Sequence, residues 1–234
     1  MNSRIQGFLL AKEKSGERDA NLIFFSKEKG KIKIFVRGAQ KSISKLAAYC
    51  QFFVYESLWL ARGKSSSHLI GGEEVASCKS IHQSWEKLKS ALFVLKNIEK
   101  REPFLRPNEK IFALAIKTFV SIDNSQELAA EKIAYAFLIK FLALSGLKPV
   151  LTKCLVCRKK ILDQKFWFDF KDGGVICASC GQKNDHNIVV GSSEIKFIDQ
   201  ILYAGLEEID CFQITAKDFL GVKKILDKFS EWHL

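Results

Sequence analysis

The amino-acid sequence predicts an α+β fold, in which a small β-barrel is followed by helices. Residues 4–77 hold five short apolar or β-branched runs separated by turn residues, which is typical of strands in a small barrel. From residue 80 onwards apolar residues recur every three or four positions, which is typical of amphipathic helices. Two closely spaced cysteine pairs interrupt this helical pattern and predict an inserted hairpin.

The first 79 residues are predicted to form the barrel. Turn signals such as Ser15-Gly16, Lys29-Gly30 and Arg37-Gly38 separate the predicted strands, which cover residues 5–10, 20–25, 32–36, 52–60 and 68–75. Five short strands in so few residues fit a closed barrel, and an SH3-like barrel would give a similar pattern. We assign residues 1–79 to a five-stranded OB-fold β-barrel.

The helical domain is predicted in two parts, residues 80–149 and 188–234, with the hairpin of residues 150–187 inserted between them. Pro107 suits the first turn of a helix, and Asp123-Asn124-Ser125 suit the start of the next one, which carries a broad apolar surface. Later helices are predicted from Ser192 and, with a capping-box pattern, from Thr215.

The charge distribution indicates which partners to expect. The chain has 37 Lys+Arg against 26 Asp+Glu, a net charge of +11. The net charge is +7 over residues 1–80 and zero over residues 151–234. A basic N-terminal part indicates nucleic acid or an anionic membrane. The apolar stretches are too short for a signal peptide or a bilayer-spanning helix, so we expect a cytoplasmic protein that does not bind membranes.

Four cysteines have the spacing of a metal site. Cys154 and Cys157 form one CxxC pair, Cys177 and Cys180 form another, and nineteen residues lie between the pairs. Four thiolates can hold one Zn²⁺ tetrahedrally and leave no coordination position open for water. We therefore expect one structural zinc ion, and the alternative is four free or redox-active cysteines.

A basic segment follows the second predicted strand. If residues 31–36 form a strand, Lys31, Lys33 and Phe35 share one face, which would present charge to solvent. The predicted nucleic-acid contacts are Lys31, Lys33, Arg37, Lys41 and Lys45. An edge strand protected by lysines would look similar. The nearby aromatic residues either stack on bases or belong to the core: Phe35, Tyr49, Phe52 and Tyr55.

No pattern of catalytic residues is present in the sequence. Gly63-Lys64-Ser65 ends like a phosphate-binding loop, but Leu58 stands where the earlier glycine is required. Gly16-Glu17-Arg18-Asp19 could hold an acid/base pair, but a turn with Glu17 and Asp19 tethering nearby backbone or Arg18 is the preferred interpretation. We expect no enzyme activity and assign no catalytic residue.

Taken together, the order of the elements and several short motifs resemble the bacterial recombination-mediator family RecO over essentially the whole chain. The motifs are Gly16-Glu17-Arg18-Asp19, Glu28-Lys29-Gly30-Lys31, Arg37-Gly38-Ala39, the helix end Leu144-Ser145-Gly146-Leu147-Lys148-Pro149, and Gly173-Gly174-Val175-Ile176-Cys177-Ala178-Ser179-Cys180. Some relatives in this family lack the cysteines, so the metal prediction comes from this sequence.

The resemblance implies an accessory protein of DNA repair and homologous recombination. Such proteins bind single- and double-stranded DNA and anneal complementary strands. With RecR they displace single-strand-binding protein so that RecA can load onto the DNA. By analogy the five cations named above would hold the DNA backbone. The helical domain would receive the acidic C-terminal tail of single-strand-binding protein in an apolar groove rimmed by lysines.

Three other functions are compatible with parts of the sequence. A zinc-ribbon RNA-binding or ribosome-associated factor would share the barrel, the charge gradient and the four cysteines. A metal-dependent nuclease would cut DNA when Mg²⁺ is added. A protein-interaction scaffold would have no salt-dependent affinity for DNA.

Overall fold

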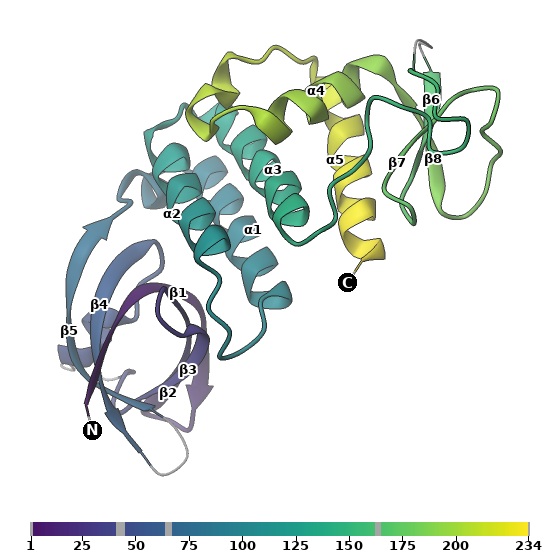
Figure 1. Ribbon diagram of the computed structural model, residues 1–234. Helices are drawn as coiled ribbons and strands as arrows, with labels where there is room; N and C mark the ends of the chain where they lie inside the picture. The colour runs from purple at the N-terminus through teal and green to yellow at the C-terminus, as the bar shows by residue number, and fades with distance from the viewer. Residues whose placement is uncertain (1, 41–44, 64–66, 162–164, 234) are drawn as a thin grey trace. The chain divides into compact units, whose positions relative to one another are not determined.

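A computed structural model describes residues 2–40, 45–63, 67–161 and 165–233 (Figure 1). The chain divides into two compact units, Met1–Ala130 and Glu131–Leu234. The first unit contains a barrel and the helices α1 (Trp85–Arg101) and α2 (Glu109–Asn124). The predicted domain boundary at residue 79 therefore lies inside the first compact unit.

The barrel is a closed sheet with the strand order β1-β2-β3-β5-β4. The strands β3 and β5 pair in parallel, and the other neighbours pair antiparallel. This arrangement confirms the predicted OB-fold. The bounds are β1 (Ser3–Ser15), β2 (Asp19–Ser26), β3 (Gly30–Val36), β4 (Val54–Arg62) and β5 (Ser67–Ser77).

One face of each strand fills the barrel interior. Leu22 and Phe24 of β2 and Ile32 and Ile34 of β3 belong to this buried core, as expected from the alternation of side chains along a strand. The first strand pairs with both β2 and β4, and its register with β2 shifts between Leu9 and Ala11. A bulge at this place bends the long strand, so that it can close the barrel.

Aromatic rings join the barrel to α2 on the outer face of the sheet. The Phe8 ring lies 5.6 Å from the Phe112 ring and 5.2 Å from the Phe119 ring, and Phe25 lies 5.8 Å from Phe112. The helix begins after Asn108, whose Oδ1 accepts a hydrogen bond from the Ile111 backbone N–H at 3.2 Å. The predicted position of Pro107 in the first turn is therefore off by two residues.

The next helix, α3 (Glu127–Leu144), starts later than predicted. Asp123 and Asn124 still belong to α2, and the Asp123 carboxylate accepts a hydrogen bond from the Ile81 backbone N–H at 2.9 Å. Most residues between 129 and 142 are buried, in agreement with the broad apolar surface predicted for this helix. Within the described part of the chain, none of the helices meets the length and apolarity needed to cross a membrane.

The second unit combines helices with a small antiparallel sheet. The sheet order is β7-β6-β8, with β6 (Lys165–Asp169), β7 (Gly174–Ile176) and β8 (Asn187–Gly191). The third of these strands was not predicted. The helices α4 (Ser192–Tyr203) and α5 (Ala216–Trp232) begin where the sequence predicted, and the Thr215 hydroxyl caps α5 by accepting from the Asp218 backbone N–H at 3.1 Å. Short 3₁₀ helices cover Lys45–Tyr49, Ser80–Gln83 and Leu206–Cys211.

A buried carboxyl group lies in the barrel wall. Glu56 on β4 is 1% exposed, and its Oε2 has no hydrogen-bond partner among the residues that the structure describes. Burial, with a further contribution from the charge of the neighbouring Glu74, raises the pKa of Glu56 to about 8. In the folded protein this carboxyl therefore stays protonated at pH values where an unfolded chain would ionise it.

Replacing Glu56 should change how stability depends on pH. A raised carboxyl pKa makes folding weaker as pH rises from about 4.5 to about 8, because only the unfolded state releases the proton in that range. The variant Glu56→Gln lacks this ionisation. Its free energy of unfolding, relative to that of wild type, should therefore rise by on the order of a few kcal/mol between about pH 5 and about pH 8. Urea denaturation at both pH values measures the difference.

The exposed Glu17→Gln variant is the control for the loss of one carboxylate. A wild-type protein and a Glu56→Gln variant with the same pH dependence would contradict the raised pKa.

Candidate nucleic-acid interface and metal centre

The outer face of β3 carries the predicted cations, but its two ends have different surroundings. Lys31, Lys33 and Phe35 share this face, as the strand register requires. Lys33 is exposed and Phe35 is half-buried, whereas Lys31 is only 6% exposed. The solvent-accessible part of the face therefore starts at Lys33.

Lys31 is buried by the loop that follows α1. Its Nζ donates a hydrogen bond to the Glu99 carbonyl oxygen at 2.5 Å and lies 4.5 Å from the centre of the Phe104 ring. The Leu105 backbone N–H donates to the Lys31 carbonyl oxygen at 2.8 Å. The prediction that Lys31 is part of an exposed cationic face is wrong, because alternation along a strand does not reveal which loop covers it.

Lys33 and Arg37 are both exposed, on β3 and on the turn that follows it. Lys33 forms an ion pair with Glu13 of β1, with 2.8 Å between Nζ and Oε2. The turn at Arg37 is held by Asp19, whose Oδ1 accepts from the Gly38 backbone N–H at 2.7 Å. This hydrogen bond confirms for Asp19 the prediction that the acids of residues 16–19 tether neighbouring backbone.

Two further predicted contacts, Lys41 and Lys45, follow β3 in the sequence. Lys45 is exposed at the start of the 3₁₀ helix Lys45–Tyr49. Lys41 lies outside the described residues. The exposed cations of the prediction that the structure describes are therefore Lys33, Arg37 and Lys45.

Most of the predicted aromatic platforms are engaged in the fold. The Tyr49 hydroxyl donates to the Gly72 carbonyl oxygen at 2.7 Å, and the Tyr55 hydroxyl donates to Gln6 Oε1 at 3.2 Å. Phe52 packs against the barrel core. Phe35, whose ring meets the edge of the His68 ring at 5.2 Å, is the partly exposed ring next to Lys33 on β3.

The four predicted metal ligands come together in the hairpin of the second unit. The Sγ atoms of Cys154, Cys157, Cys177 and Cys180 all lie within 4.8 Å of one another. The distance between the sulfurs of Cys157 and Cys177 is 3.9 Å. A tetrahedral ion with metal–sulfur bonds of about 2.3 Å places its sulfurs about 3.8 Å apart. The four side chains therefore fit a single metal ion.

The electrostatics of the cluster also favour a cation. Burial opposes ionisation of Cys154, but the backbone N–H groups of Cys177, Cys157 and Val156 outweigh it and lower the pKa of Cys154 to about 6. The Cys177 sulfur, together with the other neighbouring thiols, raises the pKa of Cys180 to about 12. Four thiolates repel one another unless a divalent ion lies between them, so the donor set fits a metal that carries positive charge.

The glycines of the second cysteine motif shape the hairpin. Gly173 has a φ of +63°, which side-chain-bearing residues rarely adopt. A Cβ on Gly174 would lie 2.8 Å from the Val150 carbonyl oxygen, where these two segments of the chain pair. The Leu155 backbone N–H then donates to the Val175 carbonyl oxygen at 2.9 Å. These contacts bring the loop of Cys154 next to the strand that leads to Cys177.

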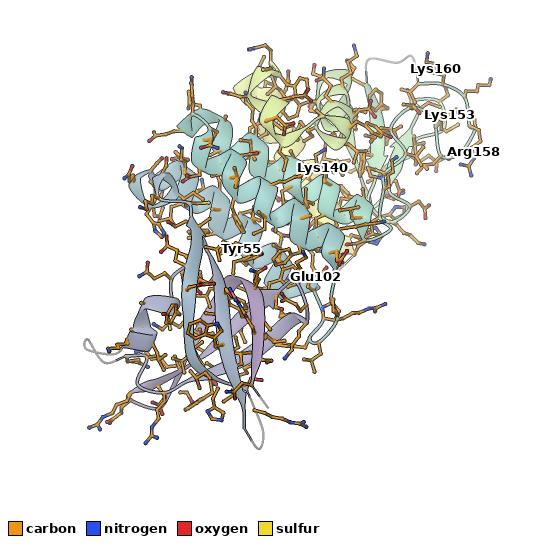
Figure 2. The ribbon with its side chains drawn as sticks, turned by 60° about the vertical axis from the view of Figure 1, so that its left-hand side comes forward. Tyr55, Glu102, Lys140, Lys153, Arg158 and Lys160 are labelled. Carbon is orange, nitrogen blue, oxygen red and sulfur yellow. The ribbon has the colours of Figure 1, made fainter. Side chains whose placement is uncertain are left out.

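A local cluster of cations surrounds the first cysteine pair and was missed by the sequence analysis. Its exposed members are Lys153, Arg158, Lys159 and Lys160. Figure 2 shows Lys153, Arg158 and Lys160 extending outward from the hairpin loops. The consecutive residues Arg158-Lys159-Lys160 were a sufficient signal, but the zero net charge of residues 151–234 concealed them.

The second unit also has a groove with an apolar floor between β8 and α5. Its volume is about 560 Å³, and its lining includes Val189 and Ile225, with Lys183 and Lys224 as cations and Glu194 as an acid. Val189 is 55% exposed. The groove thus combines an exposed apolar side chain with charged side chains of both signs.

The fold and the sites define a class, namely OB-fold proteins whose second unit carries a four-cysteine hairpin. The family model described as "Recombination protein O N terminal" matches residues 1–78, and "Recombination protein O C terminal" matches residues 82–234. The chain therefore belongs to the RecO family.

Three relatives, each named DNA repair protein RecO, illustrate the similarity. The protein of Alkaliphilus metalliredigens is 28% identical over 99% of this chain and 93% of its own length. That of Dehalococcoides mccartyi is 30% identical over 76% of this chain and 69% of its own length. The Bacillus subtilis protein is 23% identical over 99% of this chain and 89% of its own length.

Replacing one cysteine of the cluster should release the metal. The variant Cys154→Ser should bind less than one metal equivalent and should unfold more easily, with a loss on the order of several kcal/mol, because metal binding is coupled to folding of the hairpin. Elemental analysis and thermal unfolding of the purified proteins measure both effects. Cys211→Ser is the matched control, because Cys211 is exposed and lies outside the cluster. A wild-type protein purified without chelators that contains no metal would refute the site.

Proposed function

We propose that this chain is a DNA repair and homologous recombination mediator that binds single- and double-stranded DNA and anneals complementary strands. The observation that carries the proposal is the exposed pair Lys33 and Arg37 on an OB-fold of the RecO family. Lys41 and Lys45 extend the proposed contact, while the buried Lys31 supports the fold.

Annealing in this proposal requires phosphate contacts and no turnover chemistry. Lysine and arginine neutralise phosphates without reading the sequence, which leaves the base edges free to pair. A second strand needs further cations, and the hairpin carries exposed ones at residues 153–160. The released counterions make the affinity fall steeply with salt.

The metal in this proposal is one structural Zn²⁺. The four sulfur donors suit this ion and leave no position for a reacting water. Bound zinc would supply a cross-link between the loops of Cys154 and Cys177 and a positive charge that keeps the thiolates together. The chain would not use the ion for catalysis.

The proposed partners are RecR, RecA and the C-terminal tail of single-strand-binding protein. Together with RecR the chain would displace single-strand-binding protein, so that RecA loads on the freed DNA in the cytoplasm, at the nucleoid. We place the acidic tail in the groove between β8 and α5, because Lys183 and Lys224 complement its charge and Val189 offers apolar contact.

Reversing the charge of the barrel face should weaken DNA binding. The variant K33E/R37E should bind a single-stranded oligonucleotide at least about tenfold more weakly at low salt and should anneal complementary strands more slowly. Conversely Glu13→Gln should strengthen binding, because it frees Lys33 from its ion pair. Fluorescence anisotropy over a range of salt concentrations and an annealing assay measure these effects.

The double variant K89E/K117E is the matched control, because it makes the same change of net charge at exposed positions of α1 and α2. If both double variants lose the same DNA affinity, binding depends on net charge alone and the barrel face is not the binding surface. A wild-type protein that binds structured RNA tightly but does not anneal DNA would favour the RNA-binding alternative instead.

Charge reversal in the groove should affect the peptide partner. The variant Lys224→Glu should weaken binding of a peptide with the acidic C-terminal sequence of single-strand-binding protein by about tenfold, since a charge-assisted contact becomes repulsive. Isothermal titration calorimetry measures this change. Lys217→Glu, on the exposed start of α5 and outside the lining of the groove, should bind like wild type. The same affinity for wild type and Lys224→Glu would rule this groove out.

A further inference from the structure

The loop between α1 and α2 exposes two large apolar side chains at its centre. Phe104 is 50% exposed and Leu105 is 75% exposed. Leu105 also has a φ of +58°, a left-handed conformation that a leucine rarely adopts. Exposed apolar residues and local backbone strain that persist together indicate a surface with a role in binding.

The loop is held rigidly against the barrel. Pro103 and Pro107 enclose its centre and restrict its backbone. The Leu105 backbone N–H is anchored on the Lys31 carbonyl oxygen at 2.8 Å. A Cβ on Gly30 would lie 2.1 Å from the Arg106 carbonyl oxygen, so only glycine permits this close approach. Figure 1 shows the loop reaching the barrel, and Figure 2 labels Glu102, at which the loop begins.

One side of the Phe104 ring is occupied by a fixed cation. The Lys31 ammonium lies 4.5 Å from the ring centre and is held in place by its hydrogen bond to the Glu99 carbonyl oxygen. The ring is half-exposed despite this contact. It therefore has the geometry of a platform supported from one side and open on another.

The charges around this platform suit a nucleic acid. Lys31 precedes Lys33 by two residues on the same face of β3, which corresponds to about 7 Å along a strand. Lys100, Arg106 and Lys110 are exposed near the two ends of the loop; the acids of the same stretch are the exposed Glu109 and the buried Glu102, which interacts with Lys31 and Arg106. An aromatic ring within a basic surface is the combination that single-strand-binding proteins use for bases and phosphates.

We propose that Phe104 is a stacking platform for an unpaired base, with Leu105 beside it as an apolar contact. The proposal rests on the proposed function, because it requires that DNA lies on the barrel face next to Lys33. The base would stack on the open side of the Phe104 ring, while Lys33 and Arg106 contact the flanking phosphates. Lys31 then acts through Phe104 as a positioning residue and does not contact DNA.

The experiment compares an oligothymidine of about 20 nucleotides with an abasic oligonucleotide of the same length, which has the phosphates but no bases. Wild type should bind the oligothymidine about tenfold more tightly. Phe104→Ala and Phe104→Leu should lose this preference through weaker binding of the oligothymidine, with unchanged binding of the abasic strand. Phe104→Trp should keep it. Anisotropy titrations at one salt concentration measure all the affinities.

Trp85→Ala is the matched control for loss of an exposed aromatic side chain. Trp85 is 71% exposed and starts α1, which separates it from the loop by about 25 Å of helix. This variant should retain the preference for the oligothymidine. Phe104→Leu keeps an apolar side chain against Lys31, so it separates the loss of a ring from a disturbed fold.

The outcomes distinguish the two proposals. If wild type binds neither strand, the DNA-binding function fails. Suppose that wild type binds both oligonucleotides. If Phe104→Ala then has the same two affinities as wild type, or loses affinity for both oligonucleotides equally, the stacking platform is wrong while the DNA-binding function stands. Loss of binding to the acidic tail peptide with unchanged DNA binding would make this loop a protein-docking site and would also overturn the platform.

Discussion

The aromatic contacts around Phe8 determine which part of the barrel remains accessible. Phe8 and Phe25 point outward from β1 and β2 and pack on Phe112 and Phe119 of α2. Burying these rings against one another is favourable and fixes the α1–α2 hairpin on this side of the sheet. The loop between α1 and α2 then covers Lys31 but leaves Lys33 exposed. The position of the cationic surface is thus a consequence of core packing.

Local patterns predicted the barrel strands, most helix starts and the cysteine cluster, because alternation, capping residues and CxxC spacing depend on near neighbours in sequence. They failed where a distant segment decides the environment. Lys31 has the alternation of an exposed residue, yet its partner is Glu99, sixty-eight positions away. Asp123 has the chemistry of a helix cap, but it bonds the backbone of Ile81. The strand β8 was missed as well, and it pairs with β6, whose nearest paired residue lies eighteen positions earlier in the chain.

The short motifs that carried the resemblance in the sequence act mainly on the backbone. Asp19 holds the turn at Gly38, and Glu28 accepts hydrogen bonds from the Gln6 backbone N–H at 3.0 and 3.2 Å. Gly30 allows the loop after α1 to approach β3. These residues position turns and loops through contacts within the chain. The roles of these residues in the structure therefore explain the fold and do not identify the contact residues.

The metal hairpin extends the same logic to the second unit. Its strands have only three to five residues, too few to form a stable sheet without a cross-link or a packing partner. The structure supplies the packing partner, since Phe168 packs on Phe229 of α5 with 5.6 Å between ring centres, and a metal held by the four cysteines would supply the cross-link. His233, just after α5, bonds the Phe170 carbonyl oxygen at 2.8 Å. Without the metal, the hairpin would hold the end of α5 and the strand β8 less firmly. Because β8 lines the groove, a cysteine substitution should also weaken peptide binding, although no cysteine lines the groove.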